Sequence, residues 1–136
     1  METRSASLHG IRPQLNQVKE LEGIKSEEWF QNTVLRPILK LQNDLLVAVF
    51  KNYIVKHKNV FNTLNNERKL RYIEQAIQKD MKFRNALKGM VIGLFTVEEY
   101  MKYCMDSSAL NKRMMQMIIE RLKDQMQLLE TPGTAN

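Results

Sequence analysis

The segment "PILKLQNDLLVAVFKNYIVKH", residues 37–57, decides the fold class. Its apolar side chains recur at the three- and four-residue spacing of a helix, and in "LLVAVF" (45–50) they cover nearly every side. A helix that is apolar all round is buried among other helices. The segment therefore predicts the central helix of an α-helical domain. Pro37 is expected to open this helix, kink it or split it from a preceding one.

Helical patterns continue on both sides of this segment. The sequence holds only five Gly and three Pro, and no stretch alternates polar with apolar residues for long, so strands are not expected. Before the segment, Ser26 is expected to cap a helix that has Glu27 and Glu28 in its first turn. After it, "NTLNN" (62–66) predicts a turn, and a helix follows over about 66–79. The predicted fold is an all-α, compact single-domain bundle of about five helices.

Capping signals place two shorter helices in the second half of the chain. Asp80 is expected to cap the first, in which Gly89 permits close approach of a neighbouring helix and Gly93 marks the end. Thr96 and Glu99 have the T-x-x-E spacing of a capping box, so the next helix is expected to begin directly after the threonine. Its buried face is predicted to consist of four residues: Val97, Tyr100, Met101 and Cys104.

The last helix is predicted over residues 108–130, after the capping sequence "DSS" (106–108). This helix and the 37–57 helix are expected to form the central pair of the bundle. Its main apolar stripe has helical spacing: Met115, Ile118, Leu122, Gln125 and Leu129. Leu110, Met114 and Met117 widen the apolar arc in the first half. A helix with so wide an arc must contact two neighbours, or one neighbour and a second chain.

The bundle domain is predicted to span residues 26–130, and both ends of the chain differ from it. Residues 1–25 are expected to be a loosely held, flexible segment in which Pro13 and Gly23 bracket one short helix. Residues 131–136, "TPGTAN", are typical of a disordered tail. The N-terminus has no apolar signal-peptide core, and no apolar run approaches the ~20 residues of a membrane span. A cytoplasmic protein without membrane contact is therefore expected.

Positive charge is concentrated in the middle of the chain. The net charge is +6, and residues 51–88 hold ten Lys and Arg against three acidic residues. This segment is either an ordinary solvated face or a surface for a polyanion, with Tyr72 and Phe83 available for base stacking. In a nucleic-acid complex, the phosphate contacts would come from seven residues: Lys51, Lys56, Lys58, Arg68, Arg71, Lys82 and Arg84.

The two glycines of the 82–100 segment also match half of a helix-turn-helix motif. Gly89, Gly93, Leu94 and Thr96 have the spacing of its first half. The second half departs from the motif, because Glu99 stands where an apolar residue should anchor the recognition helix. A simple joint between two packed helices explains the segment with fewer assumptions.

Residues that support catalysis or metal binding are scarce. The two histidines, His9 and His57, belong to no E-x-x-H or H-E-x-x-H pattern, so no metal is predicted. Cys104 is expected on the apolar face of a helix, where a thiol behaves as an inert small hydrophobe. No cofactor and no small-molecule substrate are predicted. An enzyme is therefore the third of three interpretations.

Methionine is the remaining unusual feature, since eight of the nine Met lie between residues 81 and 126. Met side chains repack readily around different partners, so Leu110, Met114 and Met117 form a candidate partner-binding surface on the last helix. The leading interpretation is a non-enzymatic interaction or assembly module. It would act by helix–helix association with a protein partner or as a homo-oligomer. Nucleic-acid binding through the basic segment is the alternative.

Three segments carry a family resemblance: "VLRPILKLQNDLLVAVFKNYIVKHK" (34–58), "KFRNALKGMVIGLFTVEEY" (82–100) and "SSALNKRMM" (107–115). In these segments the chain resembles a small family of bacterial all-helical proteins of unknown role, over about residues 27–129. Some members carry the name glyoxalase. Neither the β-rich repeats of a type I glyoxalase nor the His and Asp cluster of a type II enzyme is evident here. The resemblance therefore implies an all-helical fold and assigns no functional residue.

Overall fold

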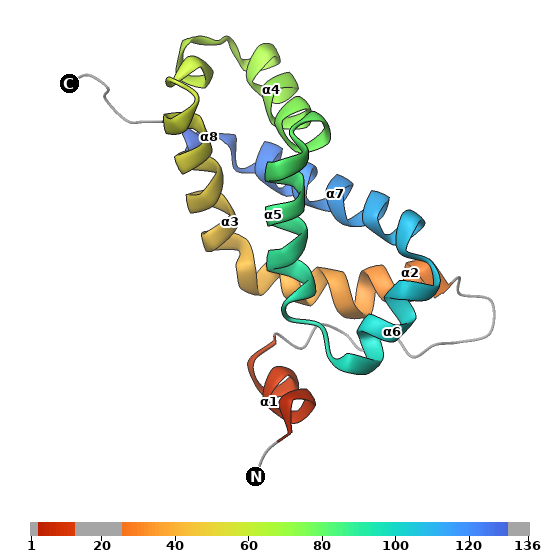
Figure 1. The fold of residues 1–136 in the computed structure, drawn as a ribbon. Coiled ribbons are helices and arrows are strands. Elements are labelled where there is room, and N and C mark those ends of the chain that lie inside the picture. Colours follow the sequence, from red (N-terminus) through yellow and green to blue (C-terminus); the bar gives the residue numbers. More distant parts are fainter. Residues whose placement is uncertain (1–2, 13–25, 131–136) are drawn as a thin grey trace.

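The computed structural model describes residues 3–12 and 26–130, and these residues form helices and short connections with no strand among them. The α-helices are α1 (Arg4–Ile11), α2 (Ser26–Phe30), α3 (Arg36–Lys56), α4 (Asn66–Lys79), α5 (Met81–Ile92), α6 (Val97–Met105), α7 (Ser107–Asp124) and α8 (Met126–Leu129). A π-helical turn (Gln31–Leu35) joins α2 to α3, and a 3-10 turn (Val60–Thr63) precedes α4. The prediction of an all-α bundle is confirmed (Figure 1), with more helices than the five expected.

Pro37 lies inside a helical rod that runs without a break from Ser26 to Lys56. A proline within a helix has no N–H to donate, and its ring clashes with the carbonyl of residue i−4. The wider π-helical turn comes directly before Pro37, and the backbone N–H of Arg36 donates to the carbonyl of Gln31, five residues back. This turn accommodates the ring without ending the helix. Figure 1 shows that the rod changes direction on its way into α3 but is not interrupted. Pro37 therefore does not split the helix.

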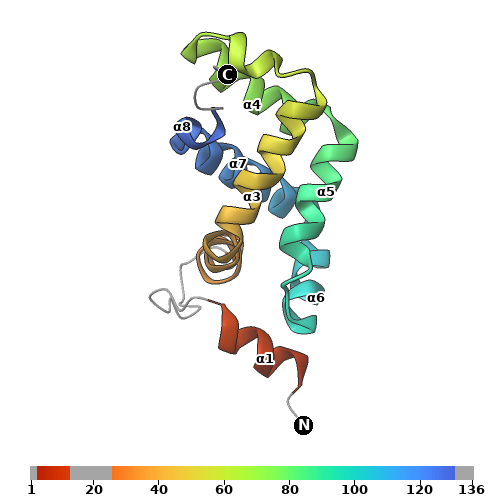
Figure 2. The same cartoon turned by 90° about the vertical axis from the view of Figure 1, so that its left-hand side faces the viewer.

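Helices α3 and α7 supply more buried residues than any other described helix, in agreement with their prediction as the central pair. Those of α3 are Pro37, Ile38, Leu39, Leu46, Phe50 and Ile54. Those of α7 are Leu110, Met114, Met115, Ile118, Ile119 and Leu122. The prediction that "LLVAVF" is buried on every side is wrong, since Leu45 and Ala48 are exposed. The helices that pack on α3 lie on one side of it, and its other side faces solvent (Figure 2).

Phe50 is the centre of an aromatic cluster that joins the end of α3 to α4 and α5. The ring centroids of Tyr53 and Phe83 lie 5.8 Å from that of Phe50, and those of Tyr72 and Phe61 lie 6.3 and 6.4 Å from it. The Tyr53 hydroxyl donates a hydrogen bond to the Asp80 carboxylate, 3.0 Å away. Burial, followed by this hydrogen bond, raises the pKa of Tyr53 to about 12. This cluster therefore fixes the angle at which α3, α4 and α5 meet.

Two of the three predicted caps of the second half are confirmed, whereas the role predicted for Gly89 is wrong. Asp106, which precedes α7, makes no side-chain capping hydrogen bond, and the last helix, predicted to continue to residue 130, ends at Asp124 and is followed by α8. Asp80 accepts a hydrogen bond from the N–H of Phe83, and the capping box of Thr96 and Glu99 is complete. Helix α5 ends at Ile92, with Gly93 as its C-cap. Gly89 is exposed, and a Cβ atom added to it would meet no atom within 4 Å. No neighbouring helix approaches this glycine, so its lack of a side chain serves no packing purpose.

Helix α1, which the sequence did not predict, is held against the joint between α5 and α6 by two arginines. Arg4 donates to the carbonyls of Phe95 and Gly93, the latter at 2.8 Å. Arg12 makes a bidentate ion pair with Glu99, at 2.6 and 3.0 Å. The predicted helix between Pro13 and Gly23 and the predicted tail of residues 131–136 lie outside the described residues. Figure 2 shows α1 below the ends of α5 and α6.

The ion pair between Arg12 and Glu99 predicts a loss of stability in acid. Burial alone would raise the pKa of Glu99, but hydrogen bonds from Arg12 and from the Thr96 N–H, with the Arg12 charge, lower it overall. A carboxylate with a lowered folded pKa stabilises the fold above its unfolded pKa of about 4.3, and this contribution is lost as the pH falls through the folded value. Urea unfolding should therefore show a smaller fall in stability from about pH 5 to pH 3 for Glu99→Gln than for wild type. Equal falls would contradict the role given to this pair.

Candidate functional site

The predicted partner-binding residues on α7 belong to the core. Leu110 and Met114 are buried, and the partly buried Met117 packs against the same core cluster. Helix α7 contacts α3, α4, α5, α6 and the π-helical turn, so its wide apolar arc is covered by neighbouring helices of its own chain. The prediction that these three residues form an exposed partner surface is therefore wrong. Of the two explanations left open for the arc, contact with several neighbours is the one observed.

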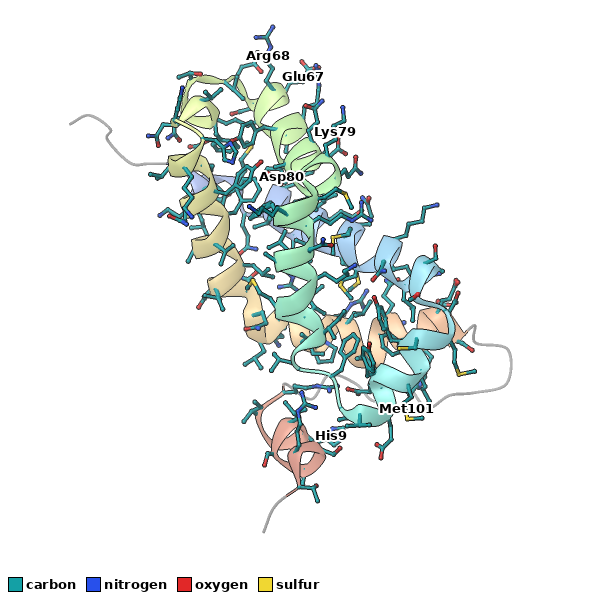
Figure 3. All side chains as sticks on the ribbon, in the orientation of Figure 1. His9, Glu67, Arg68, Lys79, Asp80 and Met101 are labelled. Carbon is teal, nitrogen blue, oxygen red and sulfur yellow. The ribbon has the colours of Figure 1, made fainter. Side chains whose placement is uncertain are left out.

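Helix α6 turns its apolar side to solvent, opposite to the prediction. Four side chains of this side are between 47% and 86% exposed: Val97, Tyr100, Met101 and Met105. Cys104, on the same side, is also exposed. The spacing of these five residues places them along one side of a helix. We call them the α6 face. Figure 3 shows Met101 on the outer side of the molecule.

Two polar contacts fix the rotation of α6 that exposes this face. On its inner side the Tyr103 hydroxyl donates a hydrogen bond of 2.6 Å to Asn111 of α7. The carboxylate of Glu99 is held by Arg12, which directly follows α1, and by the backbone N–H of Thr96. Rotating α6 to bury its apolar side would break both contacts and leave partly buried polar groups without partners, which is unfavourable. The outward direction of the α6 face is therefore a property of the fold.

A hollow of about 430 Å³ adjoins the α6 face, between α2, α6 and the start of α7. Its apolar lining includes Trp29, Phe30, Met105 and Leu110. The Lys102 Nζ atom lies 4.3 Å from the centre of the Trp29 ring, at the distance of a cation–π contact. Because Met105 belongs both to the hollow and to the α6 face, the two form one continuous apolar surface.

Helix α3 carries a second exposed apolar surface on the side away from the core. Leu41, Leu45 and Val55 are 40%, 51% and 59% exposed, and Ala48 and Asn52 between them are exposed as well. These five residues follow each other at intervals of four, three, four and three, which places them along one line of the helix. We call them the α3 stripe. This surface could not be predicted from the sequence, because the apolar pattern of α3 indicates burial on every side.

The predicted phosphate contacts are distributed over several elements. Six of the seven are exposed, and Arg84 is partly buried. Lys51 and Lys56 lie on α3, Lys58 directly follows it, Arg68 and Arg71 lie on α4, and Lys82 and Arg84 lie on α5. In Figure 3, Arg68 and Lys79 mark opposite ends of α4. The aromatic rings expected to stack on bases, Tyr72 and Phe83, pack against Phe50 instead. The cations are thus accessible, but these two rings are partly buried within the bundle.

The described part of the chain holds no group of three or more His, Cys, Asp or Glu placed to bind a metal ion. His9 lies on α1, and His57 follows α3, where its ring centroid is 4.0 Å from that of Tyr53. No helix among the described residues combines the length and apolar character that crossing a membrane requires.

The chain matches no protein-family model, no curated protein and no solved structure. The resemblance to a bacterial helical family therefore stays a prediction from sequence.

Proposed function

We propose that this protein is a non-enzymatic interaction module that binds a helix of another protein on the α6 face. The observation that carries the proposal is that an amphipathic helix, fixed in rotation by polar contacts, holds five apolar side chains in solvent. Removing apolar surface from water lowers the free energy by about 25 cal/mol per Å². Contiguous apolar surface on a folded chain is typical of sites where another molecule binds.

The composition of the α6 face supports a protein partner. Tyr and Met are enriched in protein–protein interfaces, and charged residues are depleted from interface centres. Met101 and Met105 are the most exposed members of the face, and Met adapts its shape to the side chains it meets. The hollow beside Met105 is concave, so it suits a projecting apolar side chain of the kind that anchors a helix in a groove.

The charges around the α6 face select the partner. Glu98 and Asp106 are exposed, and no ion pair joins them to a described residue. Glu98 lies on α6, and Asp106 directly follows α6 and lines the hollow, so both adjoin the apolar surface. A partner helix that carries Lys or Arg beside its apolar side would match this rim, and its association would be faster at low salt.

The experiment places a photo-crosslinking amino acid at Met101 in the full chain and, as a control, at exposed Gln78 of α4. We expect a discrete adduct in cells from position 101 only, and its loss when Val97→Glu is added. The captured protein is then purified and titrated against the unmodified chain, with the single Trp29 beside Met105 as the fluorescent reporter. Met101→Glu should raise the dissociation constant at least tenfold, which is a loss of about 1.4 kcal/mol or more of binding free energy.

Met81→Glu is the matched control, because Met81 is 59% exposed and Met101 is 64% exposed, but Met81 lies on α5. It should bind as wild type does. Equal adducts at positions 101 and 78, or equal weakening by the two substitutions, would overturn the proposal. If the adducts contain nucleic acid and affinity falls steeply with salt, the exposed cations of residues 51–88 are the functional surface instead.

A further inference from the structure

We infer that a second copy of this chain pairs with the α3 stripe, with the two α3 helices antiparallel about a two-fold axis. This inference concerns a different helix from the α6 face and does not depend on the proposed function. Apolar residues at alternating intervals of four and three form the seam of two-stranded helix pairs. The stripe has this spacing over Leu41, Leu45, Ala48, Asn52 and Val55.

The stripe is presented on a rigid support. It lies within the unbroken helix Arg36–Lys56, and Leu46, Phe50 and Ile54 on the opposite side of that helix are buried in the core. From Leu41 to Val55 a helix extends about 21 Å at 1.5 Å per residue. Figure 2 shows no described helix in front of α3, so a second helix can approach it along its length.

The charges beside the stripe specify an antiparallel pair. Asp44 and Lys51 are exposed, seven residues apart, and occupy the same flank of the stripe. Lys56 is exposed on the opposite flank. In an antiparallel pair equal flanks meet, so Asp44 of each copy meets Lys51 of the other, and the two-fold axis forms this ion pair twice. In a parallel pair opposite flanks meet, and Lys51 would face Lys56 of the other copy, which is repulsive.

The same register packs large residues against small ones. When Asp44 is opposite Lys51, Leu45 of one copy lies over Ala48 of the other, and Asn52 meets Leu41 at the two ends of the contact. Val55, the last residue of the stripe, lies beyond these ends. Interdigitation of large and small side chains favours close packing of two helices. At the ends of the contact water still reaches the Asn52 amide, so this side chain keeps its hydrogen bonds. Charge and shape therefore agree on one arrangement.

The test is analytical ultracentrifugation of the full chain from about 1 to 500 µM, a range that detects dissociation constants around the micromolar scale. A reducing agent is included because Cys104 is exposed and could cross-link two copies. We expect a monomer–dimer equilibrium in wild type. Asp44→Lys and Lys51→Asp should each raise the dissociation constant at least tenfold, because each brings like charges together twice. The double variant, Asp44→Lys with Lys51→Asp, should restore the wild-type constant to within about threefold, since the ion pairs are reversed.

The four substituted positions, which are Asp44 and Lys51 together with Leu45 and Met101 of the variants below, are all exposed. Circular dichroism and thermal unfolding should therefore confirm that every variant folds. Leu45→Glu should abolish the dimer, and Met101→Glu should leave it unchanged, which separates this inference from the α6 proposal. A wild-type chain that stays monomeric at 500 µM overturns the inference. It is equally overturned if the double variant is no better than the single variants, because the dimer would then use another surface or orientation.

Discussion

Replacing Phe50 by Ala should lower the free energy of unfolding by about 3–5 kcal/mol, the range found when a buried Phe is truncated. Phe50 has no exposed surface. Its ring contacts four other aromatic rings contributed by α3, α4, α5 and the 3-10 turn. Removing it leaves a cavity that rigid neighbouring rings fill poorly, so the loss should lie near the upper end of that range. Urea unfolding followed by far-ultraviolet circular dichroism measures the change.

Val55→Ala is the control for Phe50→Ala, because Val55 lies on the same helix and is 59% exposed. The free energy of unfolding should change by no more than about 0.5 kcal/mol through lost contacts. The higher helix propensity of Ala adds a small gain in stability. Measurements at low micromolar concentration keep self-association out of the comparison. Similar losses for the two variants would mean that the aromatic cluster is not the centre of stability.

Met114→Lys should prevent the chain from holding its native structure. Met114 is fully buried on α7, so the ammonium group would be placed in the core without a partner, an effect in the class that exceeds about 4 kcal/mol. Near-ultraviolet circular dichroism and gel filtration should report loss of fixed packing and an expanded chain. Met114→Leu keeps the volume and apolar character and should lower stability by less than about 1.5 kcal/mol.

The Met114 variants also separate the two interpretations of the Met-rich helix. Were Met114 on a partner surface, Met114→Lys would leave a stable, folded monomer and abolish only association. Met101→Lys, at an exposed position of α6, is the control and should fold with the stability of wild type. A folded Met114→Lys chain as stable as Met101→Lys would contradict the burial of α7.

The starts of α5 and α6 could be predicted because the signals that set them are local. The Asp80 cap and the Thr96–Glu99 capping box each lie within one turn of the helix that they start. The rotation of a helix about its axis is not local. The periodicity of α6 identifies its apolar side, but the contacts of Tyr103 with Asn111 and of Glu99 with Arg12 decide where that side points. The second contact joins residues 87 positions apart.

The same limit explains the errors on α7 and α3. The arc of Leu110, Met114 and Met117 is equally suited to neighbouring helices and to a second chain, and only the arrangement of the bundle decides between them. The "LLVAVF" segment is apolar on every side, so its pattern holds no information on which side the bundle leaves uncovered. For this reason an exposed surface made of apolar residues cannot be predicted from the apolar pattern of the sequence. The charges beside it, Asp44 and Lys51, are the local signal that such a surface leaves.

The attachment of α1 has a consequence for the order of folding. The hydrogen bonds of Arg4 and Arg12 join residues 82 to 91 positions apart, whereas α4 and α5 are consecutive in the chain and contact each other. Closing a long loop is entropically unfavourable until the groups at both ends are in place, and contacts of long sequence separation form slowly. The carbonyls and the carboxylate that hold α1 come into position only when α5 and α6 have met. Helix α1, although it precedes the other described helices in the chain, is thus among the last to find its place, and the first expected to detach when the protein begins to unfold.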